Sequence, residues 1–252
     1  MGILDGKIAL VTGAGQGVGQ GIAFALAGEG AAVAVTGRTE SKVIDTARQI
    51  EARGGRAIAI ACDVASPTDV ERTVAQTVQS LGGIDILVNN AYDGAFGPLL
   101  PMDDAAFMRG IVSGPLASFR FMRACHPHLK QRGGGNIINL ATSAAVRWDS
   151  SNYGAYTVAK QGVRALTRAA AAEWGADAIR VNSIAPLALS PALKHWTEED
   201  PEGKTFFNTV PLKRVGDCEK DIGRAVVAIV SNDLGYLNGA TIPLDGGQAN
   251  FD

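Results

Sequence analysis

The chain has 252 residues, of which 46% are hydrophobic and 19% charged, and its formal net charge is −2. This length suits one large α/β domain, and the apolar fraction is enough for a sizeable core. The weak negative charge gives no electrostatic basis for binding nucleic acid or an anionic membrane. No apolar run is long enough to cross a bilayer, so we expect neither nucleic acid nor membrane as a partner.

The cysteines and histidines give no indication of a metal site. Cys62, Cys125 and Cys218 show neither disulfide nor metal-ligand spacing, which suits a reduced, cytoplasmic location. Among the histidines only His126 and His128 lie close together; Cys125 precedes His126, but no acidic residue adjoins the pair and the spacing matches no metal motif. We therefore expect no bound metal.

Seven short apolar runs alternate with amphipathic stretches along the chain. The runs are 7–12, 31–36, 56–61, 84–89, 136–141, 179–184 and 240–245. They are apolar on both faces, as strands covered on both sides are. The intervening stretches, for example 39–53, 67–81 and 155–174, have helical periodicity. This alternation predicts an α/β fold with a mainly parallel, doubly wound sheet and helices on both of its faces.

No linker or charge block divides the sequence, so we expect a single domain over residues 1–252. The longest irregular stretch is about 186–212. Loops of that length in a compact domain are usually functional or mobile, and we interpret this one as a substrate lid.

A glycine-rich loop, "VTGAGQGVGQG", follows the first predicted strand. Its spacing is Gly13-x-x-x-Gly17-x-Gly19 instead of Gly-x-Gly-x-x-Gly. Glycines let the backbone turn tightly and approach a pyrophosphate, and the next helix offers free N–H groups and partial positive charge. After the first strand of a βαβ unit, the loop predicts a dinucleotide site.

The end of the second predicted strand, "VTGR", bears on the choice of cofactor. Gly37 stands where NAD sites carry an acidic residue for the ribose 2′-hydroxyl, and Arg38 follows. A guanidinium group binds a 2′-phosphate, which an acid would repel. NADP(H) is therefore favoured over NAD(H). The alternatives are that Arg38 is a solvated residue at a helix start, or that it stacks on the adenine of bound NAD.

The segment "YGAYTVAK" places Tyr156 four residues before Lys160, so both lie on one helix face. A tyrosine has an ordinary pKa of about 10, and a nearby ammonium favours the phenolate. Tyr156 is thus a candidate acid or base, although this spacing also recurs by chance on exposed helices. At the end of the fifth predicted strand, Thr142 and Ser143 each offer a hydroxyl; we favour Ser143 as the catalytic one.

These residues together resemble the short-chain dehydrogenase/reductases, in their single-domain oxidoreductase branch, over essentially the whole chain. The matching segments are "TGAGQGVG", "CDV" (62–64), "LVNNA" (87–91), the Tyr156 and Lys160 pair, "IRVNSIAP" (179–186) and "PLDGG" (243–247).

The resemblance implies a Rossmann-type sheet of seven strands in the order 3-2-1-4-5-6-7. It implies hydride transfer between a nicotinamide cofactor and a small carbonyl or alcohol substrate, in a homotetramer or dimer that packs 103–130 and 155–174 between subunits. Tyr156 would be the acid or base, Lys160 would hold the nicotinamide ribose, and Ser143 would orient the substrate. The cofactor contacts would be Gly13, Gln16, Gly17, Val18, Gly19, Arg38, Asp63, Val64, Asn90, Tyr156 and Lys160.

The sequence also departs from the family pattern. Tyr92 stands where a glycine is usual, and Ile111 occupies the position of an asparagine that precedes Gly114. Pro186-Leu187 replaces Pro-Gly. Because these changes affect proton relay and pocket shape, the alternative hypothesis is a non-catalytic or regulatory dinucleotide-binding protein.

Aromatic residues near the predicted strand ends and the lid suggest an apolar or aromatic substrate, although each could equally be core or interface packing. They are Tyr92, Phe96, Trp148, Tyr153, Trp196, Phe206 and Phe207. Arg147 is a further candidate, for an anionic substrate.

Overall fold

A computed structural model describes residues 2–146, 152–199 and 205–249. Its centre is a seven-stranded sheet in the order β3-β2-β1-β4-β5-β6-β7, in which every neighbouring pair is parallel. The strands are β1 Ile8–Thr12, β2 Ala32–Gly37, β3 Arg56–Ala61, β4 Ile86–Asn89, β5 Gly135–Leu140, β6 Ile179–Pro186 and β7 Thr241–Leu244. This confirms the predicted Rossmann-type fold, and each predicted strand end lies within two residues of the observed one.

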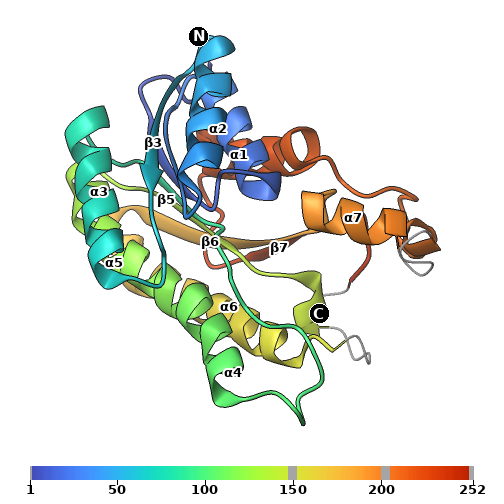
Figure 1. Ribbon diagram of the computed structural model, residues 1–252. Coiled ribbons are helices and arrows are strands. Elements are labelled where there is room, and N and C mark those ends of the chain that lie inside the picture. The colour runs from blue at the N-terminus through green and yellow to red at the C-terminus, as the bar shows by residue number, and fades with distance from the viewer. Residues whose placement is uncertain (1, 147–151, 200–204, 250–252) are drawn as a thin grey trace.

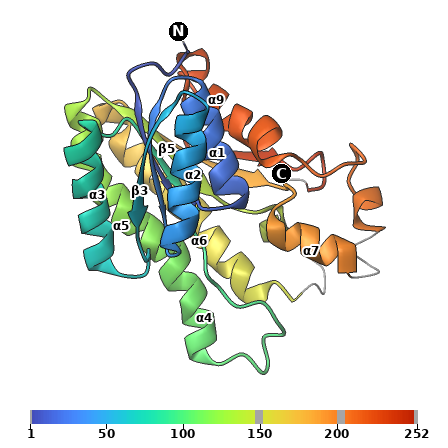
Figure 2. The same cartoon turned by 45° about the horizontal axis from the view of Figure 1, so that its top comes forward.

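Helices cover both faces of the sheet (Figure 1, Figure 2). They are α1 Gly17–Gly28, α2 Glu40–Ala52, α3 Pro67–Leu81, α4 Asp104–Ile111, α5 Ala117–Gln131, α6 Gly154–Trp174, α7 Pro191–Glu199 and α9 Arg224–Val230. Short helical turns occupy η1 Val112–Leu116, η2 Ser143–Val146, η3 Gly175–Asp177, η4 Phe207–Thr209, η5 Cys218–Gly223 and η6 Asn232–Leu234.

The two cores follow from the alternation of side chains along each strand. In β1, Ala9 and Val11 pack with α1, α2 and α9, whereas Ile8 and Leu10 face the side covered by α3, α5 and α6. Successive strand residues point to opposite faces, so a strand that is apolar throughout supplies both cores.

The predicted helix 103–130 is interrupted. It consists of α4, the π-helical turn η1 and α5, and Pro115 lies within that turn. Proline has no N–H to donate and its ring clashes with the preceding turn, so an α-helical hydrogen-bond pattern cannot continue through it. The break places Ser113 and Gly114 in buried positions behind the end of β4.

The segment 186–212, which we expected to be irregular, contains α7 and the turn η4 among its described residues. At its start, Ala188 forms a parallel bridge with Gly216. Helix α7 extends away from the sheet on the side of its carboxyl edge (Figure 1, Figure 2).

The strand order creates a crevice between β1 and β4. From β1 the chain continues outward through β2 and β3, then crosses back to place β4 on the other side of β1. Connections that leave neighbouring parallel strands in opposite directions open a binding crevice beyond their carboxyl ends. The glycine loop after β1 and residues 90–93 after β4 both lie at that point.

A buried amide ties together the elements that lead to the crevice. Asn139 on β5 is fully buried; it accepts a hydrogen bond from Asn89 Nδ2 at 2.8 Å and donates one to Thr167 Oγ1 at 2.9 Å. One side chain on β5 thus links β4 to α6.

We predict that Asn139→Ala lowers the free energy of unfolding by about 2–3 kcal/mol, since it leaves the buried polar groups of Asn89 and Thr167 without a partner. Urea denaturation followed by circular dichroism measures this. Asn232→Ala, at an exposed position, is the control, with an expected change within about 0.5 kcal/mol. Equal stabilities of the two variants would contradict the structural role of Asn139.

Candidate active site

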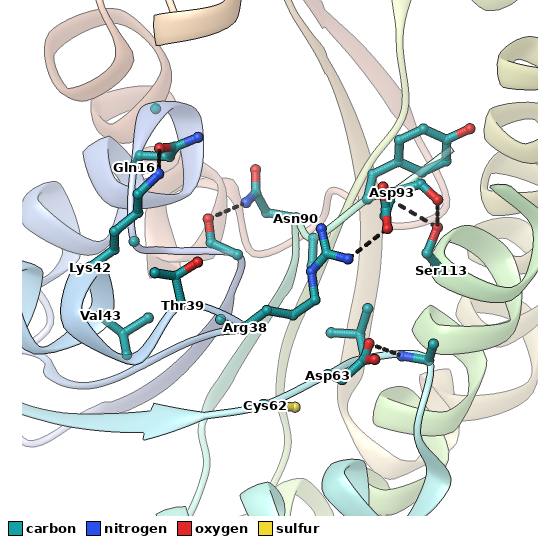
Figure 3. A pocket seen from close by; sticks show the side chains of 18 of the residues that line it. Gln16, Arg38, Thr39, Lys42, Val43, Cys62, Asp63, Asn90, Asp93 and Ser113 are labelled. Carbon is teal, nitrogen blue, oxygen red and sulfur yellow. Dashed lines mark hydrogen bonds and ion pairs between the residues drawn. The ribbon is translucent and has the colours of Figure 1, made fainter. Parts of the chain in front are cut away.

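A cavity of about 600 Å³ opens at the crevice between β1 and β4 (Figure 3). Its wall includes the glycine loop, the ends of β2 and β3, the segment after β4, the turn η1 and the start of α7. Lining residues that the sequence predicted as cofactor contacts are Gly13, Gln16, Gly17, Val18, Arg38, Asp63, Val64 and Asn90. The cavity therefore brings most of the predicted cofactor residues to one place.

Asn90 and Thr12 hold the glycine loop in shape. Asn90 Nδ2 donates to the carbonyl oxygens of Thr12 at 2.9 Å and Gly13 at 3.0 Å. Thr12 Oγ1 accepts from the backbone amides of Asn90 and Ala91 at 3.0 and 3.1 Å. A Cβ atom at Gly19 would lie 2.4 Å from Asn90 Nδ2, so the close contact between Asn90 and the glycine loop requires a glycine at position 19.

The N-terminus of α1 faces the cavity without a side-chain cap. The N-cap residue Gln16 has an extended backbone and makes no capping hydrogen bond; its Oε1 accepts instead from Lys42 Nζ at 2.6 Å. First-turn amides that lack an intrahelical acceptor are suited to an anion. Lys42, which also lines the cavity, adds a positive charge beside them.

An ion pair lies across the cavity from the glycine loop (Figure 3). Arg38 Nη1, after β2, is 2.6 Å from Asp93 Oδ2, after β4, and both side chains are exposed. The backbone of Asp93 is fixed by Ser113, whose Oγ accepts from Asp93 N at 3.0 Å and contacts Asp93 O at 2.8 Å. The segment after β4 therefore directs a carboxylate toward Arg38.

Asp63 and Val64 form another part of the wall. Asp63 is exposed and its Oδ1 accepts from Ala65 N at 3.0 Å, while Val64 is buried. In such an arrangement the carboxylate can bind the polar edge of a planar base, and the apolar side chain can pack against the face of that base.

Tyr156 and Lys160 lie on α6, which packs along β5 and β6. Lys160 is 5% exposed, and its Nζ donates to the carbonyl oxygen of Leu140, at the end of β5, at 2.7 Å. The same Nζ lies 4.9 Å from the ring centre of Tyr92 and 5.8 Å from that of Tyr156. The lysine is thus an internal group of the site, directed at a backbone carbonyl and two aromatic rings.

Burial dominates the protonation of both groups. It raises the pKa of Tyr156 above its ordinary value; the hydrogen bond with the Thr142 hydroxyl opposes this rise and Tyr153 adds to it. Burial lowers the pKa of Lys160 to about 8. Lys160 is not among the groups that shift the pKa of Tyr156, and its ammonium binds the Leu140 carbonyl.

The two candidate strand-end hydroxyls, Thr142 and Ser143, have different partners. Thr142 hydrogen-bonds with Tyr156, whereas Ser143 Oγ points to Gln248 Oε1 at 3.2 Å. Ser143 is the first residue of the turn η2, and Thr142 precedes that turn.

Aromatic rings surround the phenol of Tyr156. The ring centres of Tyr92 and Phe96 lie 5.1 Å from it, and that of Tyr153 lies 5.9 Å away. Phe96 and Tyr153 remain 58% and 36% exposed, so they offer apolar surface beside the phenol. Trp196 and Phe206 pair with each other at 5.4 Å, while Arg147 and Trp148 lie outside the described residues.

Several residues of the site were not identified by sequence reasoning. Arg109, Lys42 and Ser113 all line the cavity. Lys42 lies in the first turn of α2, directly after the strand end that carries Arg38, and this position was a usable signal for a second cation near the cofactor. Arg109 and Ser113 gave no such signal in the sequence, because the direction of their side chains depends on the helix break near Pro115.

The residues present fit a dinucleotide. Gly13, with φ of 64°, adopts the left-handed turn that a close backbone approach requires, and uncapped amides with Lys42 and Arg38 supply positive charge for phosphates. Across the described parts of the chain, no three His, Cys, Asp or Glu side chains gather as a metal site. No described helix is both long and apolar enough to cross a membrane.

The chain is similar to known dehydrogenases and reductases, as a dinucleotide-binding cavity would lead one to expect. The family described as enoyl-(acyl carrier protein) reductase matches residues 13–249. A 12α-hydroxysteroid dehydrogenase from a Clostridium species is 41% identical over 98% of both chains, and a 7α-hydroxysteroid dehydrogenase from Escherichia coli is 34% identical over 97% of this chain and 94% of its own.

Solved structures show the same relationship. A 7α-hydroxysteroid dehydrogenase complexed with NADH and 7-oxo glycochenodeoxycholic acid superposes with a TM-score of 0.92 at 32% identity, over 98% of this chain and 95% of its own. The cavity, the residues that line it and these similarities show that the chain belongs to the short-chain dehydrogenase/reductase family and is an oxidoreductase.

Proposed function

We propose that the protein reduces a ketone on an apolar, ring-containing molecule at the expense of NADPH, or oxidises the corresponding alcohol. The observation that carries this proposal is the half-buried phenol of Tyr156, which lies among aromatic rings and beside the strand-end hydroxyl of Thr142. A bound nicotinamide would supply or accept the hydride; this chain's residues provide the binding and the proton chemistry.

Tyr156 acts as the proton donor in ketone reduction. Its pKa is raised by burial, so the phenol stays protonated near neutral pH and can give its proton to the substrate oxygen as negative charge develops there. Thr142 hydrogen-bonds with that phenol, which fixes the direction of the hydroxyl and offers a second contact for the substrate oxygen. The reverse reaction requires the same phenol to accept a proton.

The substrate class follows from the surroundings of the phenol. Phe96 and Tyr153 present exposed aromatic surface next to Tyr156, which suits an apolar ring system better than a polyol. Two similar proteins are named as hydroxysteroid dehydrogenases, which supports a fused-ring alcohol or ketone. Ser190 and Pro191, at the start of segment 186–212, line the cavity at the glycine loop, so we infer that this part of the segment borders the cofactor.

NADP(H) is the favoured cofactor because of the charge around Gly37. A Cβ atom at Gly37 would lie 3.2 Å from Val43 Cγ1, so an acidic side chain there would have to displace its neighbour. Arg38, Lys42 and Arg109 all line the cavity and offer cations to a 2′-phosphate.

We also infer a homo-oligomer. Met108 on α4, Phe119 on α5 and Val158 on α6 are 48%, 39% and 49% exposed, and apolar side chains on adjacent helices suit a contact with a second copy.

Tyr156→Phe should lower the rate of ketone reduction by roughly 10²- to 10⁴-fold, the usual contribution of general acid catalysis, and should leave NADPH affinity within about threefold. Oxidation of NADPH against oxo-steroids, simple cyclic ketones and aldehydes measures the rate, and quenching of protein fluorescence measures binding. Thr142→Val should cost more activity than Ser143→Ala. Equal turnover by wild type and Tyr156→Phe would favour a non-catalytic dinucleotide binder.

Two glycines of α1 offer a matched test of the cofactor site. In Gly19→Ala the new Cβ would meet Asn90 Nδ2 at 2.4 Å and Gly13 O at 2.5 Å, whereas Gly28 has no atom within 4 Å of its Cβ position. Gly28→Ala should raise stability by up to about 1 kcal/mol with unchanged affinity for NADPH. Gly19→Ala should weaken NADPH binding at least about tenfold in calorimetry, because Asn90 no longer brackets the loop. Unchanged NADPH affinity in Gly19→Ala would contradict this assignment.

Arg38 and Asp93 should have opposite effects on NADPH affinity. Arg38→Ala removes a cation for the 2′-phosphate and should weaken NADPH binding roughly tenfold to hundredfold. Asp93→Asn removes the carboxylate that occupies Arg38 and should strengthen it. NADH affinity should change little in either case, and Arg48→Ala, an exposed arginine on α2, controls for net charge. The arginine argument fails if wild type prefers NADH or if Arg38→Ala retains full NADPH affinity.

A further inference from the structure

The ammonium of Lys160 is buried among few polar groups. Its Nζ donates one hydrogen bond, to Leu140 O at 2.7 Å. Of the titratable groups in the described part of the chain, the phenols that contact it are Tyr92 and Tyr156, with ring centres at 4.9 and 5.8 Å. An ammonium has three N–H donors, and the Leu140 carbonyl takes one of them. The nearest aromatic ring to the remaining donors is that of Tyr92, which can bind a cation through its face.

The ring of Tyr92 fits a slot formed by small residues. A Cβ atom at Gly94 would lie 2.0 Å from the Tyr92 hydroxyl oxygen, and one at Gly110 would lie 2.8 Å from it. At Gly114, in the turn η1, a Cβ atom would lie 3.4 Å from a ring carbon. Three glycines from two segments of the chain therefore leave the space that this one side chain fills.

The hydroxyl of Tyr92 makes no polar contact in that slot. The oxygen is buried and has no hydrogen-bond partner among the described residues. Because an unpaired buried hydroxyl is unfavourable, hydrogen bonding does not account for the position of this side chain. What the ring does contact is Lys160 through its face and Tyr156 at 5.1 Å in an edge-to-face arrangement.

We propose that Tyr92 is a positioning residue, whose ring face holds Lys160 as an ammonium ion against the Leu140 carbonyl and whose ring also packs against Tyr156. The negative potential of an aromatic face stabilises a desolvated cation. This gives Lys160 a second stabilising contact at a site where position 111, an asparagine in the family pattern, holds isoleucine.

The electrostatics agree with this geometry. Burial lowers the pKa of Lys160 to about 8, and a ring face opposes that fall because it favours the charged form. Burial also raises the pKa of Tyr92 to about 12, so its ring is a neutral phenol throughout the physiological range. Loss of the ring should therefore shift the Lys160 titration downward.

The test is the titration of Lys160 in the complete, cofactor-free protein. The ¹³Cε chemical shift of labelled lysine reports it, with the Lys160 signal assigned by its absence in Lys160→Arg. Tyr92→Leu should lower the Lys160 pKa by about one pH unit, as loss of a buried cation–π contact implies. Tyr92→Phe keeps the ring face and should leave the titration unchanged.

A second series keeps the shape of the ring. Phenylalanine with increasing numbers of ring fluorines at position 92 weakens the negative face at nearly constant volume, so the Lys160 pKa should fall stepwise with each fluorine. This series tests the proposal even if Tyr92→Leu does not fold. Phe96→Leu, which removes a ring from Tyr156 but not from Lys160, is the control and should leave the Lys160 titration in place.

The catalytic consequence rests on the proposed function, whereas the titration does not. At pH 8, kcat of Tyr92→Leu should be about fivefold below that of Tyr92→Phe, with little change in KM, because less Lys160 carries the ammonium whose hydrogen bond to Leu140 O holds α6 and Tyr156 in place. A Lys160 pKa that is equal in wild type, Tyr92→Leu and the fluorinated series overturns the proposal. An equal fall in Tyr92→Phe and Tyr92→Leu also overturns it, since the hydroxyl would then be responsible.

Discussion

The arrangement of the candidate active site depends on one hydrogen bond, from the ammonium of Lys160 on α6 to the carbonyl oxygen of Leu140 at the end of β5. A buried cation is costly unless it is paired, so this bond restricts where the end of β5 and the first turns of α6 can lie relative to each other. Thr142 follows two residues after that carbonyl, and Tyr156 lies one helical turn before the lysine. The contact between the Thr142 hydroxyl and the phenol is therefore a consequence of where Lys160 is held.

The cavity depends on a comparable restraint at the other side of the crevice. Asn90 binds the carbonyls of Thr12 and Gly13 and so fixes the glycine loop against the end of β4. Tyr92 follows two residues later and reaches the ring of Tyr156. A short segment after β4 thus connects the wall of the cavity to the phenol on α6.

Residue patterns in the sequence predicted the strands and most of the candidate site residues. The contacts between those residues depended on long-range geometry. The apolar runs predicted every strand of the sheet, and the glycine loop and the spacing of Tyr156 and Lys160 indicated the two halves of the site. The pairing of Arg38 with Asp93 was not predictable, because it joins loops that meet only when β2 and β4 flank β1. The different partners of Thr142 and Ser143 were not predictable either, because they depend on contacts with Tyr156 and Gln248, which are distant in the sequence. The direction of Ser113 depended on the helix break near Pro115.

The most direct test of the central claim is the protonation of Tyr156 in the cofactor-free protein. Tyrosinate absorbance, measured against pH in wild type and in Tyr156→Phe, isolates this phenol by difference. Because burial raises its pKa, the account predicts that the difference signal appears only above the ordinary tyrosine pKa of about 10. A tyrosinate that forms below pH 8 and is lost in Tyr156→Phe would contradict the protonated donor on which the account is built.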